Sequence, residues 1–194
     1  MKYDIILAGV GGQGTLSVAA IIASAALKQG LVVRQSEIHG MSQRGGAVVS
    51  HLRLSDSSID SDLIPLGNGD LLLSMEPLEA LRHIEYLSPT GRLISAAEGV
   101  NNIPVYPRIE SIHEAILAQP GARVIDARSI AKDAGSLKAM NIVMIGSAAD
   151  SIPITQEHFL SAIDERFFSK GDKVQQANRK AFEISHADAL GAGS

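Results

Sequence analysis

The chain has no cysteine and no tryptophan, and only 4% of its 194 residues are aromatic. Without cysteine it cannot form a disulfide, supply a thiol nucleophile, or hold a cysteine-ligated zinc ion or iron–sulfur cluster. If it takes part in redox chemistry, the electron carriers must be bound non-covalently or belong to a partner. The scarcity of aromatic residues argues against base-stacking platforms, and a net charge of −4 without a basic cluster argues against a nucleic-acid surface.

Long hydrophobic runs are also missing. The longest apolar stretch, around residues 18–27, is too short and too rich in alanine and serine to span a bilayer. The first residues, "MKYDIILAG", lack the long hydrophobic core of a signal peptide. We therefore expect a cytoplasmic protein without membrane contact. The balance of 45% hydrophobic and 20% charged residues is typical of globular proteins, and we expect one domain over residues 1–194.

Short apolar segments alternate with helix-like segments along the chain. Strands are predicted at 3–9, 31–38, 47–55, 64–75, 91–97 and 122–127, and helices at 15–30, 76–87, 110–121, 128–135, 155–167 and 173–190. Residues 140–150 read as a strand that runs into a helix, and the polar–apolar alternation of 47–55 is typical of a half-exposed strand. The first strand, helix and second strand predict a parallel, right-handed crossover. The whole pattern predicts a three-layer α/β/α, Rossmann-like sandwich with a mostly parallel sheet.

A glycine-rich turn joins the first predicted strand to the first predicted helix. Residues 9–14, "GVGGQG", match G-x-G-x-x-G in the strand–turn–helix context that this motif requires. Glycines let the backbone turn sharply and approach a ligand, and the N–H groups of a helix start attract anions. Thr15 is expected to cap the helix. The turn therefore predicts a phosphate site, and the alternative is a tight turn that only packs the helix on the sheet.

Two nucleotide motifs can be compared with this turn. A Walker A loop needs Lys-Ser/Thr where this chain has Thr15-Leu16, which argues against nucleoside triphosphate hydrolysis. Glu37 lies at about the distance along the chain where a dinucleotide site places its ribose-binding carboxylate. The alternative for Glu37 is a solvated carboxylate or one that braces the loop after it.

A polar, glycine-bearing loop over residues 39–46 follows the second predicted strand. Ser42, Gln43 and Arg44 bring a hydroxyl, an amide and a guanidinium next to two glycines, which suits an anion or a closely approaching partner. Catalytic patterns fail elsewhere: Ser42 misses the G-x-S-x-G spacing by one residue, and His113 lacks the second histidine of H-E-x-x-H. We expect His113 to be exposed on a helix, and His51 to brace the loop.

Taken together, four segments of the chain resemble a known family. They are "GVGGQGT" (9–15), "EIHGMSQRGGAVVSHLR" (37–53), "PLGNGDLLLSMEPLEALR" (65–82) and "NIVMIGSAA" (141–149). The chain resembles the gamma-type domain of 2-oxoacid:ferredoxin oxidoreductases over essentially its full length, and within that family the small subunit of the indolepyruvate type. Segments 100–140 and 169–194 carry no further motif of the family.

The resemblance implies a function exerted within a complex. Such enzymes decarboxylate a 2-oxoacid on thiamine diphosphate, pass electrons through iron–sulfur clusters to ferredoxin, and transfer the acyl group to coenzyme A. The indolepyruvate type takes aryl pyruvates. The resemblance places thiamine diphosphate and the clusters on a large alpha subunit, in agreement with the absence of cysteine here.

The resemblance also implies site residues, all on the coenzyme A side and none of them catalytic. The residues expected to face coenzyme A phosphates are Gly11, Gly12, Gln13, Gly14 and Thr15. Ser42, Gln43 and Arg44 are expected near the ligand or the junction with the alpha subunit. Two alternatives stay open: an autonomous NAD(P)- or flavin-dependent oxidoreductase, and a non-enzymatic interaction module whose glycines serve packing only.

Overall fold

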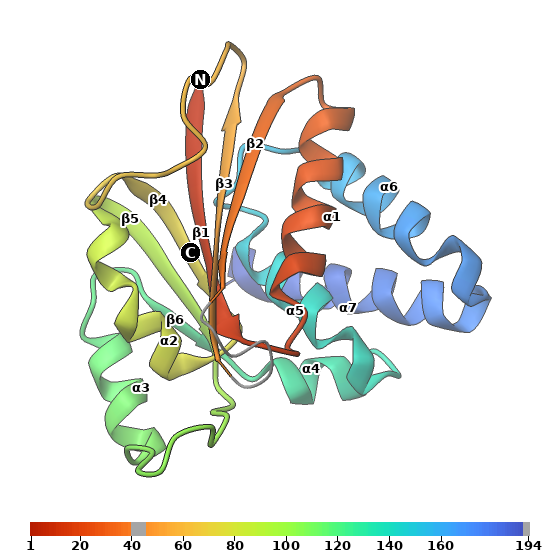
Figure 1. Ribbon diagram of the computed structural model, residues 1–194. Coiled ribbons are helices and arrows are strands. Elements are labelled where there is room, and N and C mark those ends of the chain that lie inside the picture. Colours follow the sequence, from red (N-terminus) through yellow and green to blue (C-terminus); the bar gives the residue numbers. More distant parts are fainter. Residues whose placement is uncertain (40–45, 192–194) are drawn as a thin grey trace.

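The computed structural model describes residues 1–39 and 46–191 and forms a six-stranded sheet with helices on both faces (Figure 1). The strands are β1 (Lys2–Val10), β2 (Val32–His39), β3 (Ala47–Ser55), β4 (Gly69–Ser74), β5 (Leu87–Ala96) and β6 (Arg123–Ile125). The helices are α1 (Thr15–Lys28), α2 (Pro77–Arg82), α3 (Ile109–Leu117), α4 (Ala127–Asp133), α5 (Met140–Ala148), α6 (Gln156–Phe167) and α7 (Asp172–Gly191). Three short 3₁₀ turns lie at Ile84–Tyr86, Leu137–Ala139 and Phe168–Lys170.

The sheet has the order β2-β3-β1-β4-β5-β6, and its strands are mostly parallel. β1, β4, β5 and β6 pair in parallel, whereas β3 is antiparallel to both of its neighbours, β1 and β2. β2 therefore runs in the same direction as β1, as predicted, but β3 lies between them. The connection from β2 to β3 is too short for a crossover, so these two strands are antiparallel neighbours.

Two hydrophobic clusters lie on opposite faces of the sheet and make the three predicted layers. Alternate residues of β1 divide between them: Ile5 and Leu7 face α1 and the helices α4 to α7, whereas Ile6 faces α2 and α3. The strands at the centre of a parallel sheet are covered on both faces, which explains why β1 and β4 read as continuous apolar runs.

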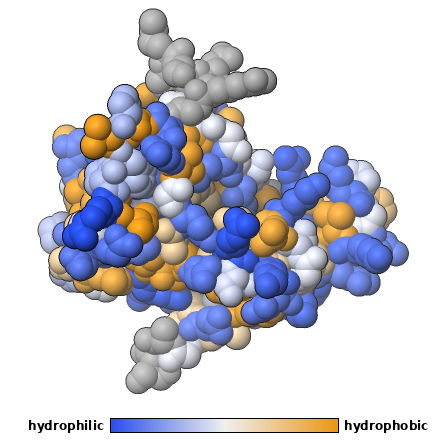
Figure 2. Space-filling view, turned by 90° about the horizontal axis from the view of Figure 1, so that it is seen from below, coloured by the Kyte–Doolittle hydropathy of each residue, from blue (hydrophilic) through white to orange (hydrophobic). Residues whose placement is uncertain are grey.

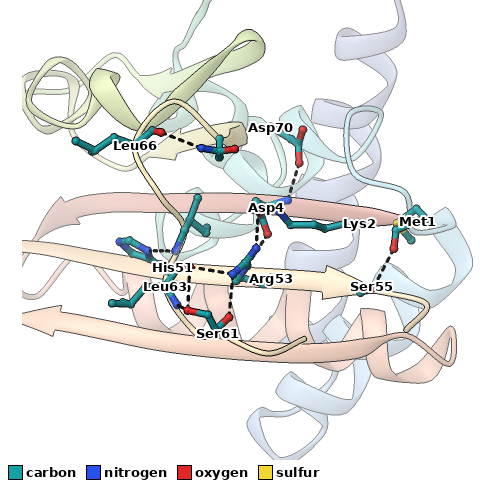
Figure 3. A network of polar contacts seen from close by, with 12 residues as sticks. Met1, Lys2, Asp4, His51, Arg53, Ser55, Ser61, Leu63, Leu66 and Asp70 are labelled. Carbon is teal, nitrogen blue, oxygen red and sulfur yellow. Dashed lines mark hydrogen bonds and ion pairs between the residues drawn. The ribbon is translucent and has the colours of Figure 1, made fainter. Parts of the chain in front are cut away.

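β3 is buried along almost its whole length, so the prediction of a half-exposed strand is wrong. The segment between β3 and β4 crosses its outer face and is held there by Arg53 (Figure 3). The Arg53 guanidinium donates to both carboxylate oxygens of the fully buried Asp4, at 2.9 and 3.1 Å, and to the carbonyls of Ser61 and Leu63 at 2.9 Å. His51, Arg53 and Ser55 of this strand thus pair with buried or part-buried backbone and carboxylate groups instead of solvent.

Residues 140–148 form helix α5 from the first residue, so the predicted strand at the start of 140–150 is wrong. This helix is apolar all round because it packs against helices on several sides, including α1, α4 and α7. A short apolar run without periodicity does not distinguish a buried strand from a buried helix. Gly146 lets α5 approach α7 closely, since a Cβ there would lie 2.6 Å from the carbonyl oxygen of Phe182.

Candidate functional site

The glycine turn lies where the carboxyl ends of β1 and β4 meet. The helix that follows β1 covers one face of the sheet, and the helix that follows β4 covers the other. The connections therefore diverge at this edge, and open α/β sheets bind ligands in the crevice outside such a switch point. Figure 2 views the molecule from this end, where hydrophilic and hydrophobic residues are interspersed.

Three glycines of the turn are required by its geometry. Gly12 and Gly14 have φ values of +102° and +80°, a region that L side chains rarely adopt. Gly9 has ordinary backbone angles, but a Cβ there would lie 2.8 Å from the hydroxyl oxygen of Thr15. The helix cap is Gly14, with no side-chain cap bond, and Thr15 is the first helical residue, so the prediction of Thr15 as the cap is wrong.

Several N–H groups of the turn have no acceptor among the described residues. Gly11 N–H donates to the carbonyl of Gly46 at 2.8 Å, but the N–H groups of Gly12, Gly14, Thr15 and Leu16 find no acceptor in residues 1–39 and 46–191. Helix starts leave such donors unpaired and carry a partial positive charge.

A second polar group supports this interpretation of the turn. The Thr15 hydroxyl is buried and has no hydrogen-bond partner within the described ranges. Buried polar atoms are nearly always paired, so this hydroxyl is a second polar group at the turn that a ligand could pair with. A phosphate group fits this set, because its oxygens accept from N–H and O–H donors alike.

The turn is held rigidly by two side-chain amides. Gln13 Oε1 accepts from Val10 N–H at 2.7 Å, and Gln13 Nε2 donates to the Met75 carbonyl at 3.0 Å, which ties the turn to the ends of β1 and β4. Asn141, at the start of α5, donates through Nδ2 to the Gln13 carbonyl at 3.0 Å. The side chain of Gln13 is thus used internally, and what remains for a ligand is the backbone of the turn and the Thr15 hydroxyl.

The turn separates two hollows. One, the front groove, has a volume of about 330 Å³ and is lined by Val10, Gly11, Gly12, Gly14, Thr15, Leu16, Ser17 and Val48. The other, the rear cavity, has a volume of about 280 Å³ and is lined by Gln13, Met75, Ala96, Ala127, Leu137, Lys138, Met140, Asn141 and Met144. The unpaired N–H groups belong to residues of the front groove, which makes it the candidate phosphate site.

A buried carboxylate next to the turn is fully used by the fold. Glu76, which follows β4, accepts from the N–H of Glu79 at 2.8 Å and from the N–H of Val100 at 3.1 Å, and its carboxylate also accepts from the hydroxyl of Tyr106. Burial and the hydrogen bond to Glu76 raise the pKa of the Tyr106 phenol. These groups cap α2 and hold the segment after β5, and they do not form an acid–base pair open to a substrate.

Four other residues were predicted from the sequence to lie near a ligand, three in the loop after β2 and one on β2. Ser42, Gln43 and Arg44 lie outside the described residues. Glu37 accepts from Gln35 Nε2 at 2.9 Å on β2, and β3 separates it from β1 by two strand spacings, about 10 Å. This position does not correspond to the ribose-binding carboxylate of a dinucleotide fold, which follows a strand directly beside the first.

Two histidines were also assigned roles from the sequence. His51 was expected to brace the loop over 39–46, but among the described residues its Nδ1 accepts from the Ile64 N–H at 3.0 Å, in the segment before β4. His113 is half-buried, with Nε2 at 2.8 Å from the Ala97 carbonyl, so the prediction that it is exposed is wrong. Across residues 1–39 and 46–191 there is no cluster of three metal-binding side chains and no helix long and apolar enough to span a membrane.

Comparisons with known proteins show the family of the chain and support its fold. A model of the family described as pyruvate ferredoxin/flavodoxin oxidoreductase matches residues 4–187. The chain is 35% identical over 193 residues to the indolepyruvate oxidoreductase subunit IorB of Pyrococcus horikoshii, covering 94% of each chain. The gamma subunit of a keto/oxoacid ferredoxin oxidoreductase from Geobacter sulfurreducens has a TM-score of 0.71 at 25% identity, over 97% of this chain and 99% of that one.

A larger solved structure shares the fold. The 2-oxoglutarate:ferredoxin oxidoreductase of Magnetococcus marinus, solved with 2-oxoglutarate, coenzyme A and succinyl-CoA bound, has a TM-score of 0.77 at 21% identity. The match covers 98% of this chain and spans 31% of that chain. The chain belongs to the pyruvate ferredoxin/flavodoxin oxidoreductase family. Within it, the chain is a subunit of a 2-oxoacid:ferredoxin oxidoreductase that is similar to IorB.

Proposed function

We propose that this chain is the small subunit of an enzyme that oxidises an aryl pyruvate such as indolepyruvate, and that it completes the coenzyme A side of the active site. The overall reaction converts the 2-oxoacid and coenzyme A to acyl-CoA and carbon dioxide and passes two electrons to ferredoxin. The substrate class rests on the similarity to IorB over nearly the whole of both chains. A role toward coenzyme A rests on the turn and on the coenzyme A present in the Magnetococcus structure of the same fold.

The observation that carries the proposal is the set of N–H groups in the front groove that find no acceptor in residues 1–39 and 46–191. Gly12, Gly14, Thr15 and Leu16 offer backbone donors at the positive end of α1, and the Thr15 hydroxyl adds a further group. The diphosphate of coenzyme A carries the charge and the acceptor oxygens that such donors bind. This chain then contributes binding and orientation of the acyl acceptor, whereas bond cleavage takes place on another subunit.

The division of labour follows from the side chains. With no cysteine in the sequence, the chain has no thiolate to ligate an iron–sulfur cluster. The family resemblance gives the proposed partner, a large alpha subunit that holds thiamine diphosphate and the clusters, and ferredoxin would dock on the complex. Thiamine diphosphate would supply the decarboxylation chemistry there. In this arrangement the isolated chain is inactive and acts only in the assembled enzyme.

The decisive experiment changes Gly12 to alanine in the assembled complex. A Cβ at Gly12 meets no atom within 4 Å, but the φ of +102° is unfavourable for alanine by roughly 1–2 kcal/mol, so the turn must relax and its donors shift. We expect a rise of about tenfold in the KM for coenzyme A, the scale of one lost charge-assisted hydrogen bond. The kcat at saturating coenzyme A and the KM for the 2-oxoacid should be unchanged.

Gly30→Ala is the matched control. Gly30 also has a positive φ, +84°, and open space around its Cβ position, but it lies at the far end of α1. It should lower stability like Gly12→Ala without affecting the KM for coenzyme A. If the two variants have the same KM for coenzyme A as the wild-type complex, the phosphate role is wrong, and a packing role for the glycines is the better explanation.

The substrate class needs its own test. The purified complex should reduce ferredoxin with a higher kcat/KM for indolepyruvate and phenylpyruvate than for pyruvate or 2-oxoglutarate. A preference for pyruvate or 2-oxoglutarate would reject the aryl pyruvate assignment and leave the coenzyme A role intact.

A further inference from the structure

We propose that Asn141 is a positioning residue for the coenzyme A site, because it sets the direction of an N–H donor in the glycine turn. This inference rests on the proposed role of the turn. Asn141 lies at the start of α5, far along the chain from the turn, and donates to the Gln13 carbonyl at 3.0 Å. It contacts the turn from the rear cavity, which it lines together with Gln13.

The hydrogen bond fixes the plane of one peptide group. In a trans peptide the C=O and the following N–H point in opposite directions. Because Asn141 holds the Gln13 carbonyl on the rear side, the N–H of Gly14 is directed away from α5. Gly14 lines the front groove and not the rear cavity, and its N–H has no acceptor within the described part of the chain. Asn141 therefore directs this donor toward the proposed phosphate site without touching the ligand.

A second observation shows that this contact is close. A Cβ at Gly14 would lie 2.4 Å from Asn141 Nδ2, so the amide occupies the space that any side chain at position 14 would need. Glycine at position 14 also leaves the peptide between residues 13 and 14 free to rotate, since its backbone tolerates many φ values. Gln13 cannot hold this peptide through its side chain, because both polar atoms of its amide bond to Val10 and Met75. Among the described residues, Asn141 is the group that hydrogen-bonds to this peptide, and its bond favours one orientation.

The test uses Asn141→Leu in the assembled complex, with ferredoxin reduction as the assay. Leucine branches at Cγ like asparagine but has no hydrogen-bonding group, and the rear cavity is already lined by methionine and alanine side chains. We expect the KM for coenzyme A to rise about tenfold, the scale of one lost charge-assisted hydrogen bond. The kcat at saturating coenzyme A and the KM for the 2-oxoacid should stay at wild-type values, which a general loss of structure would not allow.

Two further variants keep the outcome interpretable. Met140→Leu changes the lining of the rear cavity without removing the hydrogen bond, so its KM for coenzyme A should match the wild type. Asn141→Ala removes the donor with a smaller side chain and should reproduce the effect of leucine if Asn141→Leu fails to assemble. An unchanged KM for coenzyme A in both Asn141 variants, or equal changes in Met140→Leu, would overturn the positioning role.

Gly12→Ala separates this inference from the proposed function. If Gly12→Ala raises the KM for coenzyme A and the Asn141 variants do not, the turn binds coenzyme A but Asn141 does not position it. If none of these variants changes that KM, the proposed function itself is wrong, and the inference falls with it.

Discussion

The buried ion pair between Arg53 and Asp4 gives the sharpest prediction about stability. Arg53→Met keeps the length of the side chain but removes the guanidinium, which makes two hydrogen bonds to Asp4 and one each to the carbonyls of Ser61 and Leu63 (Figure 3). Asp4 is fully buried and would be left with only the Lys2 ammonium, at 2.8 Å, as a charged partner. Removing one partner of a buried pair costs about 3–5 kcal/mol, and we expect the lower end because Lys2 remains.

The measurement is urea unfolding of the purified chain, read by circular dichroism. A loss of about 3 kcal/mol is a large share of the 5–15 kcal/mol that holds a typical domain folded. Hydrogen exchange should also become faster in the segment between β3 and β4, because Arg53 anchors its carbonyls. Arg34→Met is the control: its guanidinium lies 3.7 Å from Asp62, both side chains are more than half exposed, and the expected loss is below about 1 kcal/mol. Equal losses in the two variants would refute the reasoning.

Two further predictions concern packing and pH. Gly146→Ala should lower the free energy of unfolding by about 1–3 kcal/mol, because the new methyl group would lie 2.0 Å from the Ser185 hydroxyl and overpack the contact of α5 with α7; a wild-type urea midpoint would contradict this. Burial lowers the pKa of both His51 and His83, so the unfolded chain binds more protons than the folded chain below about pH 6.5, and stability should fall as the pH drops through that value. His83→Leu should make this dependence shallower, and an unchanged slope in urea unfolding at a series of pH values would count against it.

Local sequence patterns predicted the parts of the site that local geometry determines. The glycine spacing after an apolar strand identified the turn because three of its four glycines are required by local geometry: Gly12 and Gly14 adopt positive φ values, and Gly9 makes room for Thr15. The alternation of strand-like and helix-like segments predicted the three layers for the same reason. The residue spacing that marks a strand or a helix depends only on neighbours along the chain.

The features that sequence reasoning missed depend on contacts between distant segments. No spacing rule connects Asn141 with Gln13, because their contact exists only once α5 has packed beside the turn. The polar residues of β3 predicted a half-exposed strand. In the structure Arg53 is paired with Asp4 from a neighbouring strand and is covered by the segment between β3 and β4. The sequence predicted Thr15 as the cap of α1, but Gly14 is both the last residue of the turn and the cap of the helix.

The measurement that tests the central claim most directly is purification of the tagged chain from its native cells, with mass spectrometry and visible absorbance of what comes with it. The proposed function predicts a brown complex with one large, cysteine-rich, thiamine-binding subunit that forms acyl-CoA in the presence of coenzyme A. A colourless chain that comes without that partner and binds NAD(P) would contradict it, and the glycine turn would then be an ordinary dinucleotide site.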